Sequence, residues 1–138
     1  MHNVVFDISV LVSALITKGK SKELWLKAAR KEFNLITSRE VFSEFIKVIR
    51  RAKFQKYVRE RDIREFLEVL NVTARFAHTK SRFKVVRQDP DDDIILRAAY
   101  DSRADCIVSG DEHLLALKEF RGIRIVTVSE MLELLKRP

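Results

Sequence analysis

Short apolar runs alternate along the chain with stretches in which apolar residues recur at helical spacing. The runs predict strands over 4–6, 33–36, 107–108 and 123–128, and residues 85–86 fit either a short strand or an extended loop. Helices are expected over 9–16, from Ser21, from Ser38 to 49, over 62–75, from the run DPDDD to 102, over 111–117 and from Ser129 to the end.

Strands that alternate with helices indicate an α/β fold. Val4, Val5 and Phe6 are all apolar, as in a strand that is buried on both faces of a parallel sheet. We therefore predict a three-layer α/β/α domain with a central parallel sheet of four or five strands. No linker, repeat or low-complexity tract interrupts the order, so residues 1–138 are interpreted as a single domain.

Basic residues outnumber acidic ones by 27 to 20, which gives a net charge of +7. Many of them fall between 47 and 64, where Phe54 and Tyr57 lie among lysines and arginines. This excess favours a polyanionic partner, although a basic surface that only keeps the protein in solution is an equal alternative on charge alone.

Composition also argues against several classes of protein. The single cysteine, Cys106, excludes an internal disulfide and lies in an apolar run, so we expect it to be buried. The three histidines are scattered, which argues against a zinc hydrolase, and the three glycines form no phosphate-binding loop. The apolar stretch 10–16 is too short to span a membrane, so a cytoplasmic location is expected.

Acidic residues stand at places where a sheet of this kind binds ligands. Asp7 follows the first strand and Asp111 follows another, so both are expected at the carboxyl edge of the sheet. Glu44 lies on a helix, and Asp89, Asp91, Asp92 and Asp93 crowd a helix start. Each has an ordinary alternative as a helix cap, a turn residue or a solvated acid. Together they suit a hard divalent cation, which prefers oxygen ligands.

In these motifs the sequence resembles the PIN-domain ribonucleases, and within them the VapC-like toxin components of prokaryotic toxin–antitoxin systems. The motifs are the strand before Asp7, the segment Ser38-Arg-Glu-Val-Phe-Ser-Glu44, the acidic run from Asp89 to Asp93, and Val108-Ser-Gly-Asp111. The resemblance implies a PIN-like fold in which the metal-binding and catalytic carboxylates are Asp7, Glu44, Asp92 and Asp111, with Asp93 as the alternative third ligand.

The first motif departs from the family pattern. The family commonly has Asp-Thr-Asn where this chain has Asp7-Ile8-Ser9, so Ile8 offers no hydroxyl. Ser9 is the residue left to hydrogen-bond a neighbouring carboxylate or a metal-bound water, and we include it among the catalytic residues.

The resemblance implies a Mg²⁺- or Mn²⁺-dependent endoribonuclease that cleaves single-stranded RNA, in which the metal activates water and neutralises the leaving oxygen. RNA is expected to bind the basic segment, through Arg50, Arg51, Lys53 and Lys56, with Phe54 or Tyr57 stacking on bases or buried in the core. An antitoxin partner is possible, and a homodimer is expected through Trp25, Phe66 and Phe76. The alternative is an inactive PIN-like module that binds nucleic acid or a protein.

Overall fold

The computed structural model describes residues 1–84 and 90–137, and the expected extended segment at 85–86 lies outside them. Within these residues six strands form one sheet in the order β3-β2-β1-β4-β6-β5. The strands are β1 (Asn3–Phe6), β2 (Asn34–Thr37), β3 (Arg75–Phe76), β4 (Cys106–Val108), β5 (Glu119–Phe120) and β6 (Ile123–Val126).

The sheet is mostly parallel, and only β5 runs antiparallel to its neighbour β6. The three-layer α/β/α class is confirmed, but six strands replace the predicted four or five. The extra strands β3 and β5 have two residues each, so they are too short to give a hydropathy pattern of their own.

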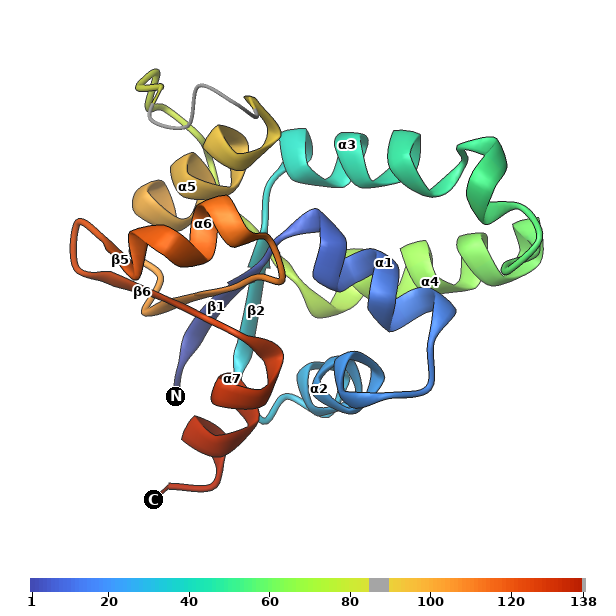
Figure 1. Cartoon of the computed structure of the whole chain (residues 1–138), viewed down its shortest axis with the longest axis horizontal. Helices are drawn as coiled ribbons and strands as arrows, with labels where there is room; N and C mark the ends of the chain where they lie inside the picture. Colours follow the sequence, from blue (N-terminus) through green and yellow to red (C-terminus); the bar gives the residue numbers. More distant parts are fainter. Residues whose placement is uncertain (85–89, 138) are drawn as a thin grey trace.

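Seven α-helices fill the rest of the described chain: α1 (Ile8–Ile16), α2 (Lys20–Ala29), α3 (Arg39–Ile49), α4 (Glu60–Thr73), α5 (Pro90–Ser102), α6 (Glu112–Leu117) and α7 (Val128–Leu135). A short 3-10 helix, η1 (Ala52–Phe54), follows α3. Helix α5 packs against β1, β2 and β4 on one side of the sheet, whereas α1 and α2 lie on the other side (Figure 1).

Helix starts follow local capping chemistry. Ser38 caps α3 as predicted, since its hydroxyl accepts from the Val41 amide. Thr127 caps α7 in place of the expected Ser129, because the Thr127 hydroxyl and the Glu130 carboxylate exchange hydrogen bonds with each other's amides. Helix α2 likewise begins directly after Gly19, one residue before Ser21.

The sheet is buried on both faces. Val5 of β1 pairs with Ile36 of β2 and with Ile107 of β4, and all three side chains are fully buried. Cys106 is buried with a free thiol, as predicted. In residues 1–84 and 90–137, no helix is long and apolar enough to cross a membrane.

Two of the three residues proposed for a dimer interface belong to the core. Trp25 and Phe66 stack on each other at 4.3 Å between ring centres, with 5% and 6% of their surfaces exposed. Phe76 lies on β3, not on an outer helix, and packs against Phe42. The apolar periodicity of α2 and α4 reflects packing between these two helices. Trp25 and Phe66 therefore have almost no surface left for a dimer interface.

Helices α3 and α4 extend away from the sheet, and the chain turns back between them through η1 (Figure 1). The central part of the basic segment, Arg50 to Arg59, forms this turn. This turn carries basic side chains and no acidic one, so one end of the molecule is strongly positive.

Candidate active site

Two neighbouring strands bring Asp7 and Asp111 together. Strands β1 and β4 pair in parallel with Phe6 opposite Val108, and each aspartate follows its strand at the carboxyl edge. Each carboxylate also caps the next helix: Asp7 accepts from the Val10 amide, and Asp111 accepts from the amides of His113 and Leu114. Capping was the simple alternative for Asp111, whereas Asp7 was expected to be a turn residue if it had no role in a site. Both residues in fact cap a helix, and both also lie at the same edge of the sheet.

Ser109 joins the two aspartates. Its fully buried side chain donates a hydrogen bond to Asp7 Oδ2, and its oxygen accepts one from the Asp111 amide at 2.9 Å. Ser9 donates to Asp7 Oδ1 at 2.7 Å, one of the two roles expected for it. Sequence reasoning missed Ser109, although a hydroxyl residue two positions before Asp111 at a strand end was a usable signal.

The surroundings of Asp7 disfavour its negative charge overall. Burial raises the pKa of the Asp7 carboxyl, the hydrogen bonds from Ser109, Ser9 and the Val10 amide lower it, and the charge of Asp111 raises it again. The net result is a raised pKa, since Asp7 is only 3% exposed. A nearby cation would reverse this effect by stabilising the carboxylate.

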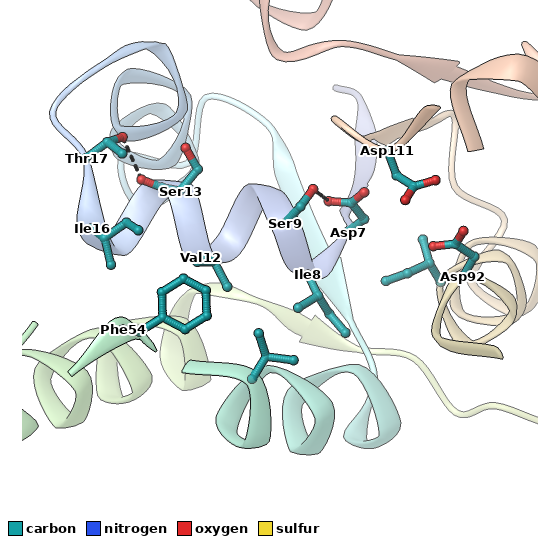
Figure 2. A pocket seen from close by; sticks show the side chains of 12 residues that line it. Asp7, Ile8, Ser9, Val12, Ser13, Ile16, Thr17, Phe54, Asp92 and Asp111 are labelled. Atoms are coloured by element: carbon teal, nitrogen blue, oxygen red, sulfur yellow. Dashed lines mark hydrogen bonds between the residues drawn. The ribbon is translucent and has the colours of Figure 1, made fainter. Parts of the chain in front are cut away.

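Asp92 completes a group of three carboxylates around one pocket. It lies in the first turn of α5, is 6% exposed, and lines the pocket together with Asp7 and Asp111. Figure 2 shows the three side chains directed toward one another. Asp93 is equally buried but is not among the residues that line this pocket, and Asp89 lies outside the described residues.

Glu44 is not brought into the same pocket. Its carboxylate lies 3.9 Å from the ammonium of Lys47 on the same helix. Glu44 precedes Val48 by four residues, so both are on one face of α3, and Val48 does line the pocket. Glu44 therefore lies on the face of α3 that borders the pocket, but outside the residues that line it.

The oxygen atoms of the site suit a hard cation. A carboxylate oxygen has about two lone pairs, and Asp7 Oδ1 uses both, for Ser9 and for the Val10 amide. Among the described residues, Asp7 Oδ2 accepts only from Ser109, and Asp111 Oδ2 accepts no hydrogen bond. Those two oxygens are therefore available to a metal ion.

The carboxylates do not yet form a closed metal cage. Among residues 1–84 and 90–137, no group of three or more His, Cys, Asp and Glu side chains is arranged to hold an ion. The donor chemistry of the site nevertheless fits Mg²⁺ or Mn²⁺, which take oxygen ligands.

The pocket continues beyond the carboxylates as an apolar groove, and the whole pocket has a volume of about 340 Å³. Its walls come from α1, α3, η1 and α5, through Ile8, Val12, Ile16, Val48, Phe54 and Ile95. Phe54 and Thr17 lie at the end of the groove away from Asp92 and Asp111 (Figure 2).

The basic segment borders the far end of this groove. Lys53 Nζ lies 5.1 Å from the centre of the Phe54 ring, so a positive charge stands next to an aromatic wall. Tyr57 is 64% exposed and does not line the groove. Arg50 forms an ion pair with Glu60 at 2.6 Å, so part of its charge is already neutralised.

A family model described as PIN domain matches residues 3–113. The matched region contains all three pocket carboxylates and Glu44. No curated protein matches the chain.

Proposed function

The chain belongs to the PIN-domain family, whose members are generally metal-dependent nucleases, and from this we propose that it is a Mg²⁺- or Mn²⁺-dependent endoribonuclease acting on single-stranded RNA. The observation that carries the proposal is the meeting of Asp7, Asp92 and Asp111 in one pocket, from three elements far apart in the sequence.

Each residue of the site has a role in this proposal. Asp7, Asp92 and Asp111 hold the metal, mainly through the available oxygens of Asp7 and Asp111, and Asp93 is the alternative third ligand. Ser9 and Ser109 orient Asp7 by donating to its two oxygens. Glu44 adds negative charge on the face of α3 that borders the pocket, partly offset by Lys47. A bound divalent ion supplies the activation of water and the neutralisation of charge on the phosphate.

Substrate affinity comes from outside the carboxylate group. Metal-free carboxylates repel phosphate, so the RNA backbone needs cations elsewhere, and Arg51, Lys53 and Lys56 stand exposed at the end of the molecule that borders the groove. As the biological role we propose the toxin component of a toxin–antitoxin pair in the cytoplasm, with a homodimer formed through a surface other than Trp25 and Phe66. The four acidic motifs of the VapC-like proteins support this role.

One observation favours a second candidate, a PIN-like module that binds nucleic acid or a protein without cleaving. Ile8 places an apolar side chain in the pocket directly beside Asp7, where the family commonly has a hydroxyl. A module of that kind has no need of a metal. Thermal unfolding with and without Mn²⁺ separates the two, because an ion that binds only the folded state raises the melting temperature.

The decisive variant is Asp7→Asn. It keeps the size of the side chain and the helix cap but removes the negative charge of a metal ligand. Cleavage of single-stranded RNA with Mn²⁺ should fall by on the order of 100-fold or more, while RNA binding is retained. The measurements are the cleavage rate across a Mn²⁺ titration and binding by fluorescence anisotropy. Asp105→Asn, on the opposite edge of the sheet, is the control, and cleavage by Asp7→Asn at the parental rate would overturn the proposal.

A further inference from the structure

Two parallel stripes of side chains run along α1 from the carboxylates to the far end of the groove. One stripe is apolar, with Ile8, Val12 and Ile16, and the other carries hydroxyls, with Ser9, Ser13 and Thr17. Each stripe repeats every four residues, which keeps its members on one helix face. All six residues contribute to the lining of the pocket. In Figure 2 the apolar stripe is directed toward Phe54, whereas the Ser9 and Ser13 hydroxyls are directed to the other side of α1.

Core packing accounts for only part of the apolar stripe. Val12 is 7% exposed and belongs to the core, whereas Ile8, Ile16 and Phe54 pack against the core with part of their surfaces and border the groove with the rest. Phe54 closes the groove opposite α1 with a flat ring. A slot with an aromatic wall, aliphatic side chains and open access suits a flat heterocycle.

The three residues of the hydroxyl stripe differ in the hydrogen bonds that they make. The Ser9 hydroxyl donates to Asp7, and the Thr17 hydroxyl donates to the Ser13 carbonyl at 2.7 Å, where α1 ends. The Ser13 hydroxyl makes no hydrogen bond to another residue in the described parts of the chain. It lies at the border of the groove, halfway along α1, as an available donor and acceptor.

Distances along the helix fit a nucleic-acid strand. Ile8 and Ile16 are eight residues apart, which corresponds to about 12 Å along α1 at 1.5 Å per residue. Stacked nucleotides advance by about 3.4 Å each, so the groove is long enough for a base that lies one or more nucleotides from a phosphate at the carboxylates. Lys53, beside the Phe54 ring, offers a charge for the next phosphate.

We propose that the apolar stripe and Phe54 form a subsite for one unpaired nucleobase of the RNA, and that Ser13 contacts the sugar–phosphate backbone of the same strand. This inference rests on the proposed nuclease function and adds to it the reason for a single-stranded substrate. A paired base is held in a duplex and cannot enter the slot, so the groove selects a strand whose bases are free. Tyr57, which is equally aromatic, has no part in the subsite because it lies outside the groove.

The first test changes the RNA and leaves the protein intact. A short single-stranded RNA is prepared as a set in which one nucleotide at a time lacks its base, and each member is bound to Asp7→Asn protein so that cleavage does not intervene. Removal of the base at one position should weaken binding by about 5- to 150-fold, and removal elsewhere should have a much smaller effect. Equal affinity for all members of the set would overturn the proposal.

The second test assigns that position to the groove. In Phe54→Ala the intact RNA and the RNA lacking the critical base should bind equally, whereas Phe54→Trp and the control Tyr57→Ala should keep the difference. Ser13→Ala should weaken both RNAs by the same factor, since a backbone contact does not depend on the base. Circular dichroism verifies that each variant is folded, and the base-removal series on Asp7→Asn protein stands even if Phe54→Ala does not fold.

The outcomes separate this inference from the nuclease proposal. Parental cleavage by Asp7→Asn overturns the nuclease, whatever the base-removal series gives. A base effect that persists in Phe54→Ala overturns the subsite and leaves the nuclease standing. If an apolar peptide binds the groove and RNA does not displace it, the groove serves a protein partner and the proposed base subsite is wrong.

Discussion

Ser109 shows how an uncharged residue organises a charged site. Its hydroxyl accepts from the Asp111 amide and donates to Asp7, so it fixes both sides of the pocket at once. A hydroxyl can do this because it is both donor and acceptor. Ser109 therefore positions the carboxylates without contacting the proposed substrate.

The buried negative charge of Asp7 should destabilise the folded protein when no metal is bound. Asp7→Asn removes that charge and keeps a good helix cap, so its melting temperature in metal-free buffer should exceed that of the parent at about pH 7. A raised pKa in the folded state means that the cost is present above that pKa and disappears as the pH falls toward the usual value of 3.8.

The gain from Asp7→Asn should accordingly shrink on acidification, which thermal scans from neutral pH down to about pH 4 would reveal. Saturating Mn²⁺ should reverse the order of the two proteins, because only the parent keeps the full set of ligands. A variant that is less stable than the parent at neutral pH without metal would contradict the burial argument.

At the scale of single residues, the sequence predicted the positions of the acidic residues better than it predicted their contacts. Asp7 and Asp111 were predictable because they follow apolar strands, and parallel pairing brings strand ends together. The difference between Asp92 and Asp93 was not, because it depends on the rotation of α5 about its axis. The prediction that Glu44 belongs to the site rested on the family motif alone. Its contact with Lys47 depends on the direction of the side chain, which the sequence does not give.

Among the elements, residues 78–84 stand out because they have no regular structure but are held at several points. Asp101 of α5 accepts from the amides of Lys80 and Ser81 at 2.7 and 3.0 Å and from the Ser81 hydroxyl at 2.6 Å. Arg97 of α5 donates to the Phe83 carbonyl at 3.0 Å. The segment is thereby fixed to the helix that carries Asp92.

An aromatic cluster reinforces this attachment. The guanidinium of Arg121 lies within 4.6 to 5.0 Å of the ring centres of Phe83, Tyr100 and Phe120. Arginine binds aromatic faces well because its charge is delocalised over a flat group. Segment 78–84, α5 and β5 are thus joined around one cation.

Asp101→Asn should release this segment. Burial raises the pKa of Asp101, but the hydrogen bonds from Ser81 and Lys80 outweigh it and leave the pKa below its usual 3.8. Loss of a bond to a charged acceptor should speed amide exchange at Lys80 and Ser81 by about tenfold or more, measured by NMR.

The attachment should also depend on pH in the parent. Because the pKa of Asp101 is lowered, its contribution is present above about pH 4 and is lost as the pH falls through the folded-state value. Asp105→Asn is the matched control, since Asp105 also accepts a backbone amide, that of Asn3 at 2.8 Å, at a distant place. Faster exchange at Lys80 in that control would show that the effect is not local.

For the molecule as a whole, the basic turn and the carboxylates lie at opposite ends of one groove. The basic turn between α3 and α4 lies at one end, and the groove leads from it to the carboxylates. Arg50 is paired with Glu60, so the exposed lysines nearby are the better phosphate contacts. A strand of RNA would then be held at the turn and cut at the sheet edge.

Salt dependence of binding should report this arrangement. Changing Lys53 and Lys56 together to Ala should reduce the slope of log affinity against log salt by about 1.4, at about 0.7 for each phosphate contact with a single strand. Arg50→Ala should change it less, because Glu60 already shares that charge. The control pair Lys27 and Lys136, both paired with glutamates elsewhere, removes the same charge and should leave the slope unchanged.

The layered fold was predictable from the order of apolar runs and helical stretches, because each long strand is buried and each helix has an apolar face. What the sequence could not give was contact between helices. Trp25 and Phe66 look the same in sequence whether they face a second molecule or each other, and only the packing of α2 against α4 decides between these cases.

The two short outer strands have a consequence for how this protein meets other chains. Strands β3 and β5 offer two residues each, and Arg75 and Glu119 place exposed charges there. An unpaired strand is normally a template on which another polypeptide extends the sheet or begins to aggregate, and short charged borders oppose both. A protein partner should therefore recognise side chains on the helices, with no strand added to the sheet.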